Sequence, residues 1–317
     1  MSSRIQPDRP ARLPDRPPTP TEPAGIPPRI GNVRALSRGL WADAHGYQRL
    51  AYLVGAGLIV IGLAHAAMWA VAGGSASGPL SWRKPTTFGM SFGLTTLALG
   101  WVGFYLPVRR TIGWIAAGLL CAATTYEVAW VVVQHARGMV SHFNDTTVLD
   151  ERLFVMGAMM VAIAILVIAA MTLAAFVRTT APAPMALAIR LGLVALLDAD
   201  ADPTVQSMST YGAAGSMKFA HAVPMHAIQV LAALAWLLSL SGLPQRRQLH
   251  LVALAVGGYA GLFGVALLRT TSGLAPVDLF DASILGYLPA AALLVAPAAV
   301  AITAVTTHDR RAPSPKD

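Results

Sequence analysis

The stretch RLFVMGAMMVAIAILVIAAMTLAAFV, from Arg152 to Val177, decides the fold of this chain. Every residue after Arg152 is uncharged and nearly all are apolar. At a rise of about 1.5 Å per residue, a helix of this length crosses about 30 Å of hydrocarbon. The stretch therefore predicts a membrane-spanning helix rather than a core helix of a soluble domain.

The rest of the chain has the same character. Charged residues make up 12% of its 317 residues and the mean hydropathy is +0.58, whereas a soluble domain carries about a quarter charged residues. A backbone in lipid must satisfy its own hydrogen bonds, so each apolar segment is expected to be a helix. We predict an all-α, polytopic integral membrane bundle of about eight transmembrane helices, at residues 50–71, 87–107, 111–133, 152–177, 181–197, 219–241, 251–268 and 283–305.

The segments flanking this bundle are polar. Residues 1–45 are rich in Pro and Arg and cannot bury much apolar surface, so we predict a disordered tail, followed by a transmembrane domain at 46–307 and a short tail at 308–317. With both termini cytoplasmic, most of the 23 Lys and Arg residues fall on the cytoplasmic side. The net charge of +8 then indicates membrane topology, with the lipid bilayer as partner and no nucleic acid. High Ala, Arg and Pro usage suggests a bacterial inner membrane.

Two features of the spans need separate mention. Segment 181–197 is short and contains Arg190, but without this crossing Arg246 and Arg247 would fall on the outer side. We therefore predict that it spans the membrane. Gly257, Gly261 and Gly264 form a stripe of small residues that predicts close helix packing.

Polar residues gather in EVAWVVVQHARGMVSHFND, from Glu127 to Asp145, where the third span leaves the membrane. Ionisable groups in hydrocarbon are costly, so each is expected to have a partner or a function. Helical rise puts Glu127, His65, Arg190 and His226 at nearly one depth on four different spans. These residues predict either a Glu127–Arg190 ion pair or a polar site facing the periplasmic or extracellular side.

The candidate site residues follow from these positions. Catalytic roles are predicted for Glu127, His142 and His226. Ligand binding is predicted for Arg83, Lys84, Gln134, Arg137, Asn144, Arg190 and Gln229. A metal ion is predicted to use His65, His221 and His226.

Each group also has a structural interpretation. Asn144, Asp145 or Thr146 is a candidate helix cap, and Trp82 beside the basic pair is typical of a membrane-interface anchor. His221 and His226 are five residues apart, not the three or four that suits a helical metal pair, unless Pro224 kinks the helix.

Three functions remain open, and whether the chain is an enzyme is not decided. A membrane-embedded redox enzyme, linked to haem or quinone, would ligate haem through His65 and His226. A metal-dependent enzyme acting on a lipophilic substrate would bind a divalent ion through His142, His221 and His226. The alternative is a transporter or receptor for a small anionic or amphiphilic ligand. The single cysteine, Cys121, supports no disulfide or Cys-built metal site.

Overall fold

The computed structural model describes residues 40–74, 80–201, 210–211, 214–278 and 280–311. Most of the predicted N-terminal tail, residues 202–209 between the fifth and sixth apolar segments, and residues 312–317 lie outside this range. Of the predicted tail, residues 40–42 are helical, and the Arg49 side chain donates hydrogen bonds to the carbonyls of Trp41 and Ala42. This part of the chain is therefore attached to the first long helix.

All eight apolar segments are helical, which confirms the all-α class. The helices are α2 (Gly46–Ala72), α3 (Arg83–Val102), α4 (Arg110–Ala136), α5 (Val148–Val177), α6 (Ala183–Ala201), α8 (Met217–Met225), α9 (Ala227–Ser239), α10 (Gln245–Thr271) and α11 (Tyr287–Arg311). Two 3-10 turns, η1 (Gly103–Tyr105) and η2 (Ala282–Gly286), extend α3 and precede α11. A two-stranded antiparallel pair, β1 (Thr210–Tyr211) and β2 (Gly215–Ser216), precedes α8.

Length and composition give seven helical stretches of the described chain that can cross a membrane. The eighth, Ala183–Leu197 within α6, is apolar but shorter. The fold is therefore that of a multi-pass membrane-type helical bundle, and a crossing by α6 stays a prediction.

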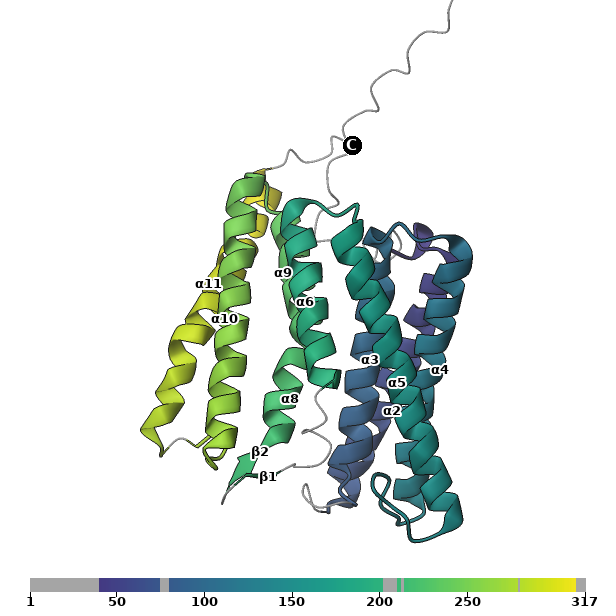
Figure 1. Ribbon diagram of the computed structural model, residues 1–317. Helices are drawn as coiled ribbons and strands as arrows, with labels where there is room; N and C mark the ends of the chain where they lie inside the picture. The colour runs from purple at the N-terminus through teal and green to yellow at the C-terminus, as the bar shows by residue number, and fades with distance from the viewer. Residues whose placement is uncertain (1–39, 75–79, 202–209, 212–213, 279, 312–317) are drawn as a thin grey trace, which may run out of the picture.

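The bundle has two halves (Figure 1). Helices α2 to α5 form one half, while α6 and α8 to α11 form the other, and the halves meet where α5 contacts α6 and α3 contacts α9. Helices α2, α4, α6 and α10 begin at the end drawn uppermost, here called the upper end. Helices α3, α5, α8 and α11 begin at the opposite, lower end. The first long helix begins and the last one ends at the upper end.

Burial follows the pattern of a bundle with an apolar exterior. Large side chains such as Leu193 of α6 and Ile228 of α9 are fully buried, and these two helices pack together closely. Equally apolar side chains point outward, because Leu166 is 69% exposed and Leu268 is 68% exposed. An apolar exterior of this kind suits contact with lipid.

Glycines bring α2 and α3 into backbone contact. A Cβ atom added at Gly89 would lie 2.6 Å from the Cα of Gly62, and one at Gly93 would lie 2.7 Å from the carbonyl oxygen of Gly55. Only hydrogen fits at these positions, so the two backbones touch without intervening side chains.

The predicted glycine stripe on α10 is wrong in part. A Cβ atom at Gly258 would meet the Ala290 carbonyl oxygen at 2.7 Å, and one at Gly261 would meet Ala290 Cβ at 3.0 Å. At Gly257 and Gly264 a Cβ atom would meet nothing within 4 Å. The face of α10 that packs on α11 therefore contains Gly258 and Gly261. The predicted face, with Gly257 and Gly264, is rotated from it by about one residue around the helix, which the sequence spacing alone did not reveal.

The sixth apolar segment is an interrupted helix, as Pro224 suggested. Helix α8 ends at Met225, His226 has φ −99° and ψ 3°, and α9 begins at Ala227. Proline has no backbone N–H, so Pro224 cannot donate to the Ala220 carbonyl four residues earlier. At the break, the Val223 carbonyl accepts hydrogen bonds from the His226 backbone N–H at 3.2 Å and from the Tyr259 hydroxyl of α10 at 2.8 Å.

Candidate functional site

A hydrogen-bond network closes the loop between α4 and α5. The fully buried Asp150 carboxylate accepts hydrogen bonds from Gln134 Nε2 at 2.8 Å, Thr147 Oγ1 at 2.6 Å and Arg137 Nη1 at 2.7 Å. Arg137 also donates to the Gln134 side-chain oxygen. These bonds give Gln134 and Arg137, both predicted ligand residues, a structural role at the end of α4.

Thr147 is the N-cap of α5, where Asn144, Asp145 or Thr146 was expected. Its hydroxyl accepts from the Asp150 backbone N–H at 3.1 Å, while Asp150 accepts in turn from the Thr147 hydroxyl. The spacing Thr147–Asp150 is that of a capping box, a sequence signal that could have identified it. Asn144 instead closes the preceding turn, because its Oδ1 accepts from the backbone N–H and hydroxyl of Thr146.

Two buried polar atoms lie on successive turns of α4 without partners. Glu127 is 2% exposed and Trp130 is 4% exposed, and neither Glu127 Oε1 nor Trp130 Nε1 has a hydrogen-bond partner among the described residues. Gly157 of α5 lies opposite, where an added Cβ would come 2.6 Å from the Trp130 ring and 3.1 Å from Glu127 Oε1. Unpaired buried polar atoms are costly, so this pair needs an explanation beyond packing.

Glu127 lines a cavity of about 40 Å³ at the boundary between the two halves. One half contributes Thr95 of α3, Thr124 of α4 and residues of α5, and the other contributes Leu196 of α6 and Met225 of α8. This volume is enough for one or a few water molecules. Glu127, whose Oε1 has no partner among the described residues, thus lines a cavity formed by both halves of the bundle.

Gln229 forms a bridge between the halves beside this cavity. Its side-chain amide lies 3.0 Å from Thr95 Oγ1. In the orientation that satisfies every partner, the amide nitrogen donates to the carbonyls of Met225 and His226, at 3.2 and 3.0 Å, and the amide oxygen accepts from Thr95. The break in the α8–α9 helix is therefore connected directly to α3.

His142 lies between aromatic rings at the lower end. Its ring stacks on Trp130 at 4.7 Å and meets Phe88 edge-on at 5.5 Å, and Ser141 Oγ lies 3.0 Å from its Nδ1. Burial, with a smaller contribution from Lys84, lowers the pKa of His142 to about 3. His142 is thus neutral at physiological pH and covers the unpaired Trp130 from the loop side.

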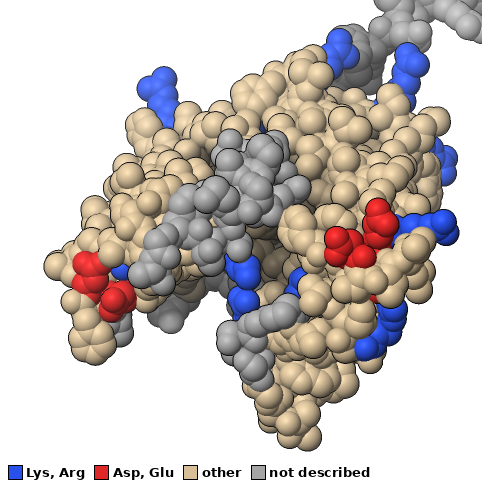
Figure 2. Space-filling model, turned by 60° about the horizontal axis from the view of Figure 1, so that its bottom comes forward, with Lys and Arg blue, Asp and Glu red and all other residues tan. Residues whose placement is uncertain are grey.

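Basic side chains surround a hollow in the lower end of the bundle (Figure 2). Lys84 lies near the start of α3 with its ammonium group 5.9 Å from the Phe88 ring centre. It interacts electrostatically with Lys218 of α8, which repels it, and with Glu127, which attracts it. Acidic side chains lie nearer the edges of this face (Figure 2). The exposed Arg83 begins α3 at the same end.

Arg190 does not pair with Glu127. Its Nε donates to the Ala175 carbonyl at 2.9 Å and its guanidinium lies 5.5 Å from the Phe176 ring centre. Glu127 contacts Gly157, which lies about 27 Å from Ala175 along α5 at helical rise. Arg190 therefore satisfies a last-turn carbonyl of α5, which the helix dipole favours. The sequence placed Arg190 and Glu127 at the same depth by counting residues along their helices. This count predicted the wrong partner because the long Arg190 side chain extends toward the upper end.

The histidines predicted as metal or haem ligands belong to helices in different halves of the bundle. His65 of α2 bonds to the Ile61 carbonyl and lies near Trp82, which contacts His135 of α4. His221 and His226 belong to α8 and its break, in the other half. Within the described residues, no group of three or more His, Cys, Asp or Glu side chains is arranged to hold a metal ion.

Sequence reasoning missed Phe88, Trp130 and Gly157 as neighbours of Glu127 and His142, and Lys218 as a neighbour of Lys84. Trp130 follows Glu127 by three residues, so helical spacing could have identified it. The other three come from separate helices, and their proximity is a tertiary property.

Comparisons with protein-family models, with curated proteins and with solved structures gave no match to this chain. The class that the fold defines is a multi-pass membrane-type helical bundle, and its function has to be inferred from the site itself.

Proposed function

We propose that the chain spans a membrane, binds a small anionic ligand at its lower end and couples that ligand to protonation of Glu127. Of transport and binding alone, we favour transport, because the bundle consists of two halves that can move relative to each other. The observation that carries the proposal is the Glu127 carboxyl group, whose Oε1 has no partner among the described residues and whose side chain lines a cavity enclosed by both halves.

The charges near Glu127 support an anionic ligand. Lys84 and Lys218 repel each other at the lower end, and an anion between them would relieve this repulsion. The same anion would compete with Glu127 for Lys84. Ligand binding and the protonation state of Glu127 are then linked, and such linkage acts equally in both directions.

The interrupted helix supports movement of a ligand rather than binding alone. Transporters form their sites at discontinuous helices, where irregular backbone lines a cavity. Here Met225, the last residue of α8, lines the Glu127 cavity, and Gln229 connects the break to Thr95 of the other half. Two halves joined at such a position can shift relative to each other.

The redox and metal-dependent enzyme functions remain predictions from sequence. Transport is preferred because His65 and His226 lie in different halves and the described residues offer no three-ligand metal group. An outward-facing lower end, with both termini cytoplasmic, is part of the proposal and rests on the distribution of basic residues.

The proposal is tested with purified protein in liposomes on a solid-supported membrane. Inorganic phosphate, acetate, succinate and citrate are applied separately at mildly acidic and mildly alkaline pH, and charge movement is recorded. We expect at least one anion to give a saturable current. Lys84→Gln should weaken the apparent affinity for that anion by roughly tenfold, the effect of losing one charged contact.

Glu127→Gln should remove the pH dependence of the current while anion binding persists. Arg152→Gln is the matched control for Lys84→Gln, because it removes an exposed positive charge from the lower end of another helix, α5. An anion that binds without current would indicate a receptor. If folded protein neither binds nor moves any of the four anions, the proposal fails.

A further inference from the structure

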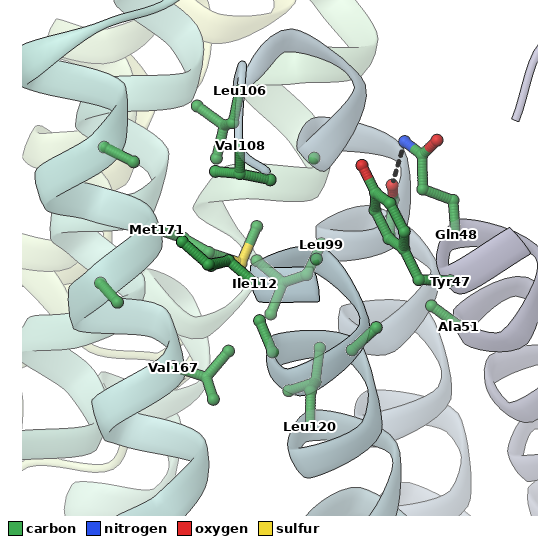
Figure 3. Close-up of a pocket in the computed structure, with 17 residues that line it drawn as sticks. Tyr47, Gln48, Ala51, Leu99, Leu106, Val108, Ile112, Leu120, Val167 and Met171 are labelled. Carbon is green, nitrogen blue, oxygen red and sulfur yellow. Dashed lines mark hydrogen bonds between the residues drawn. The ribbon is translucent and has the colours of Figure 1, made fainter. Parts of the chain in front are cut away.

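A second cavity lies between α2, α3, α4 and α5 in the upper part of the bundle (Figure 3). Its volume is about 100 Å³, larger than that of the Glu127 cavity. Most of its lining is apolar and includes Leu99, Leu106, Ile112, Leu120 and Met171. Leu120 borders both cavities, so this second cavity occupies the part of α4 nearer the upper end.

The few polar groups at this cavity leave it apolar. Gln48 is 1% exposed, its Nε2 donates to the Gly100 carbonyl at 3.1 Å, and its Oε1 accepts from the His45 backbone N–H at 2.8 Å. The amide is thus used within the protein (Figure 3). Gly100, Gly103 and Gly113 contribute no side chain to the lining.

An unfilled apolar cavity of this size is unfavourable. The lining atoms lose packing contacts, and apolar cavities exclude water because they offer it no hydrogen-bond partners. An acyl chain from the surrounding bilayer would fill such a cavity and restore the missing packing contacts. The cavity lies within helices that are long and apolar enough to cross that bilayer.

Three arginines at the upper end lie close in sequence to residues that line the cavity. Arg109 and Arg110 lie three and two residues before Ile112 of the lining, and Arg178 follows the lining residue Ala174 by about one helical turn. All three are exposed, and within the described part of the chain no acid pairs with their side chains. Basic residues beside an apolar cavity match a molecule with an anionic head and an apolar tail.

We propose that this cavity binds an acyl chain of an anionic phospholipid whose phosphate is held by Arg109 and Arg110. The site is separate from the Glu127 cavity and does not depend on transport. Its ligand is a structural or regulatory lipid of the leaflet at the upper end.

The test uses purified full-length protein in mild detergent, titrated with phosphatidylglycerol or phosphatidylcholine and observed by native mass spectrometry. We expect phosphatidylglycerol to be retained and phosphatidylcholine of the same chain length to be lost at equal activation energy. The double variant Arg109→Gln, Arg110→Gln should bind phosphatidylglycerol roughly tenfold more weakly, because it loses the headgroup contacts.

Two matched controls separate the parts of the site. Arg246→Gln with Arg247→Gln removes two exposed charges from the same end in the other half and should leave retention unchanged. Ala116→Phe should fill the cavity and abolish retention, whereas Ala122→Phe, on the exposed face of α4, should not. The exposed arginine variants keep the test valid if Ala116→Phe misfolds.

Equal retention of both lipids, or no difference between the two arginine pairs, would overturn the proposal. Retention that survives Ala116→Phe in folded protein would also overturn it, because the tail would then lie elsewhere.

Discussion

At the residue scale, buried polar side chains of the lower end fall into two groups. Asp150 receives three strong hydrogen bonds and fixes the loop between α4 and α5. Glu127 and Trp130 are equally inaccessible, yet each has an unpaired atom among the described residues. The first group is expected to stabilise the fold, and the second is the group on which the proposed function rests.

Gln134→Leu tests the stabilising group. Leucine fills a similar volume but cannot donate to Asp150 or accept from Arg137. Leaving these buried partners incomplete should lower the free energy of unfolding by about 1–3 kcal/mol. SDS titration of the protein in mixed micelles measures the loss. Val133→Ala, on the half-exposed face of the same turn, should cost much less, and equal costs would contradict this account.

His142 should give the fold a specific pH dependence. The pKa of His142 is about 3 in the folded protein, below the usual value near 6.5, so the unfolded chain binds the proton first as pH falls. The contribution to stability is complete above about pH 6.5 and declines progressively toward pH 3.

The measurement is the melting temperature against pH for wild type and His142→Phe. Wild type should lose more stability than the variant as pH falls below about 6.5. His250→Phe, at an exposed position of α10, should follow wild type. Parallel curves for wild type and His142→Phe would contradict a buried neutral imidazole.

At the element scale, the sequence predicted best those features that depend on one helix alone. Apolar length located all eight helices, and Pro224 located the interruption. Errors arose where the answer depends on a neighbouring helix. Gly257 and Gly264 face open space while Gly258 meets Ala290, because helix rotation is set by the partner.

The candidate site shows the same division between features of one helix, which could be predicted, and contacts between helices, which could not. Glu127 and the lower end were indicated by one intramembrane carboxylate and the polar stretch after it. Its partners were not, because depth counting ignores side-chain reach: Arg190 bonds to Ala175 at the far end of α5. Lys218 and Phe88 approach only after the helices assemble.

Tyr259→Phe tests how the interrupted helix is stabilised. The Tyr259 hydroxyl donates to the Val223 carbonyl at 2.8 Å across from α10, and its loss leaves that acceptor without this donor. We expect a decrease in unfolding free energy of about 1 kcal/mol and faster amide exchange around His226. Tyr52→Phe is the control, since no hydrogen bond of its hydroxyl is present in the described structure. Identical exchange in all three proteins would contradict this role.

At the scale of the whole molecule, the two ends of the bundle carry different arrangements of charged side chains. The upper end has exposed arginines close in sequence to the lining of an apolar cavity, and the lower end has two lysines whose charges interact with each other. This polarity has meaning only if the chain crosses a membrane with the predicted orientation and α6 completes a crossing.

Cysteine accessibility in intact cells tests that orientation. Cys121 is the only cysteine and is buried, so Cys121→Ser gives a background for single cysteines at exposed positions 180 and 214, before and after α6. A membrane-impermeant maleimide should label Ala214→Cys in intact cells and Thr180→Cys only after permeabilisation. A cysteine replacing Arg246 should behave like the one at 180. Labelling of 180 and 214 from the same side would show that α6 does not cross.

The glycine contact between α2 and α3 sets the mechanical properties of the bundle. Where the backbones of α2 and α3 touch, at Gly62 and Gly89, no side chains lie between them that could rearrange. We therefore expect these two helices to move together as one rigid unit. The boundary at Thr95 and Gln229 is joined by one side-chain hydrogen bond and has an adjoining void. Among the described residues, the only other side-chain hydrogen bond between the helices of the two halves is that from Arg190 of α6 to Ala175 of α5. If the proposed transport involves a change of shape, we therefore expect the halves to move relative to each other at this boundary while α2 and α3 move as one unit.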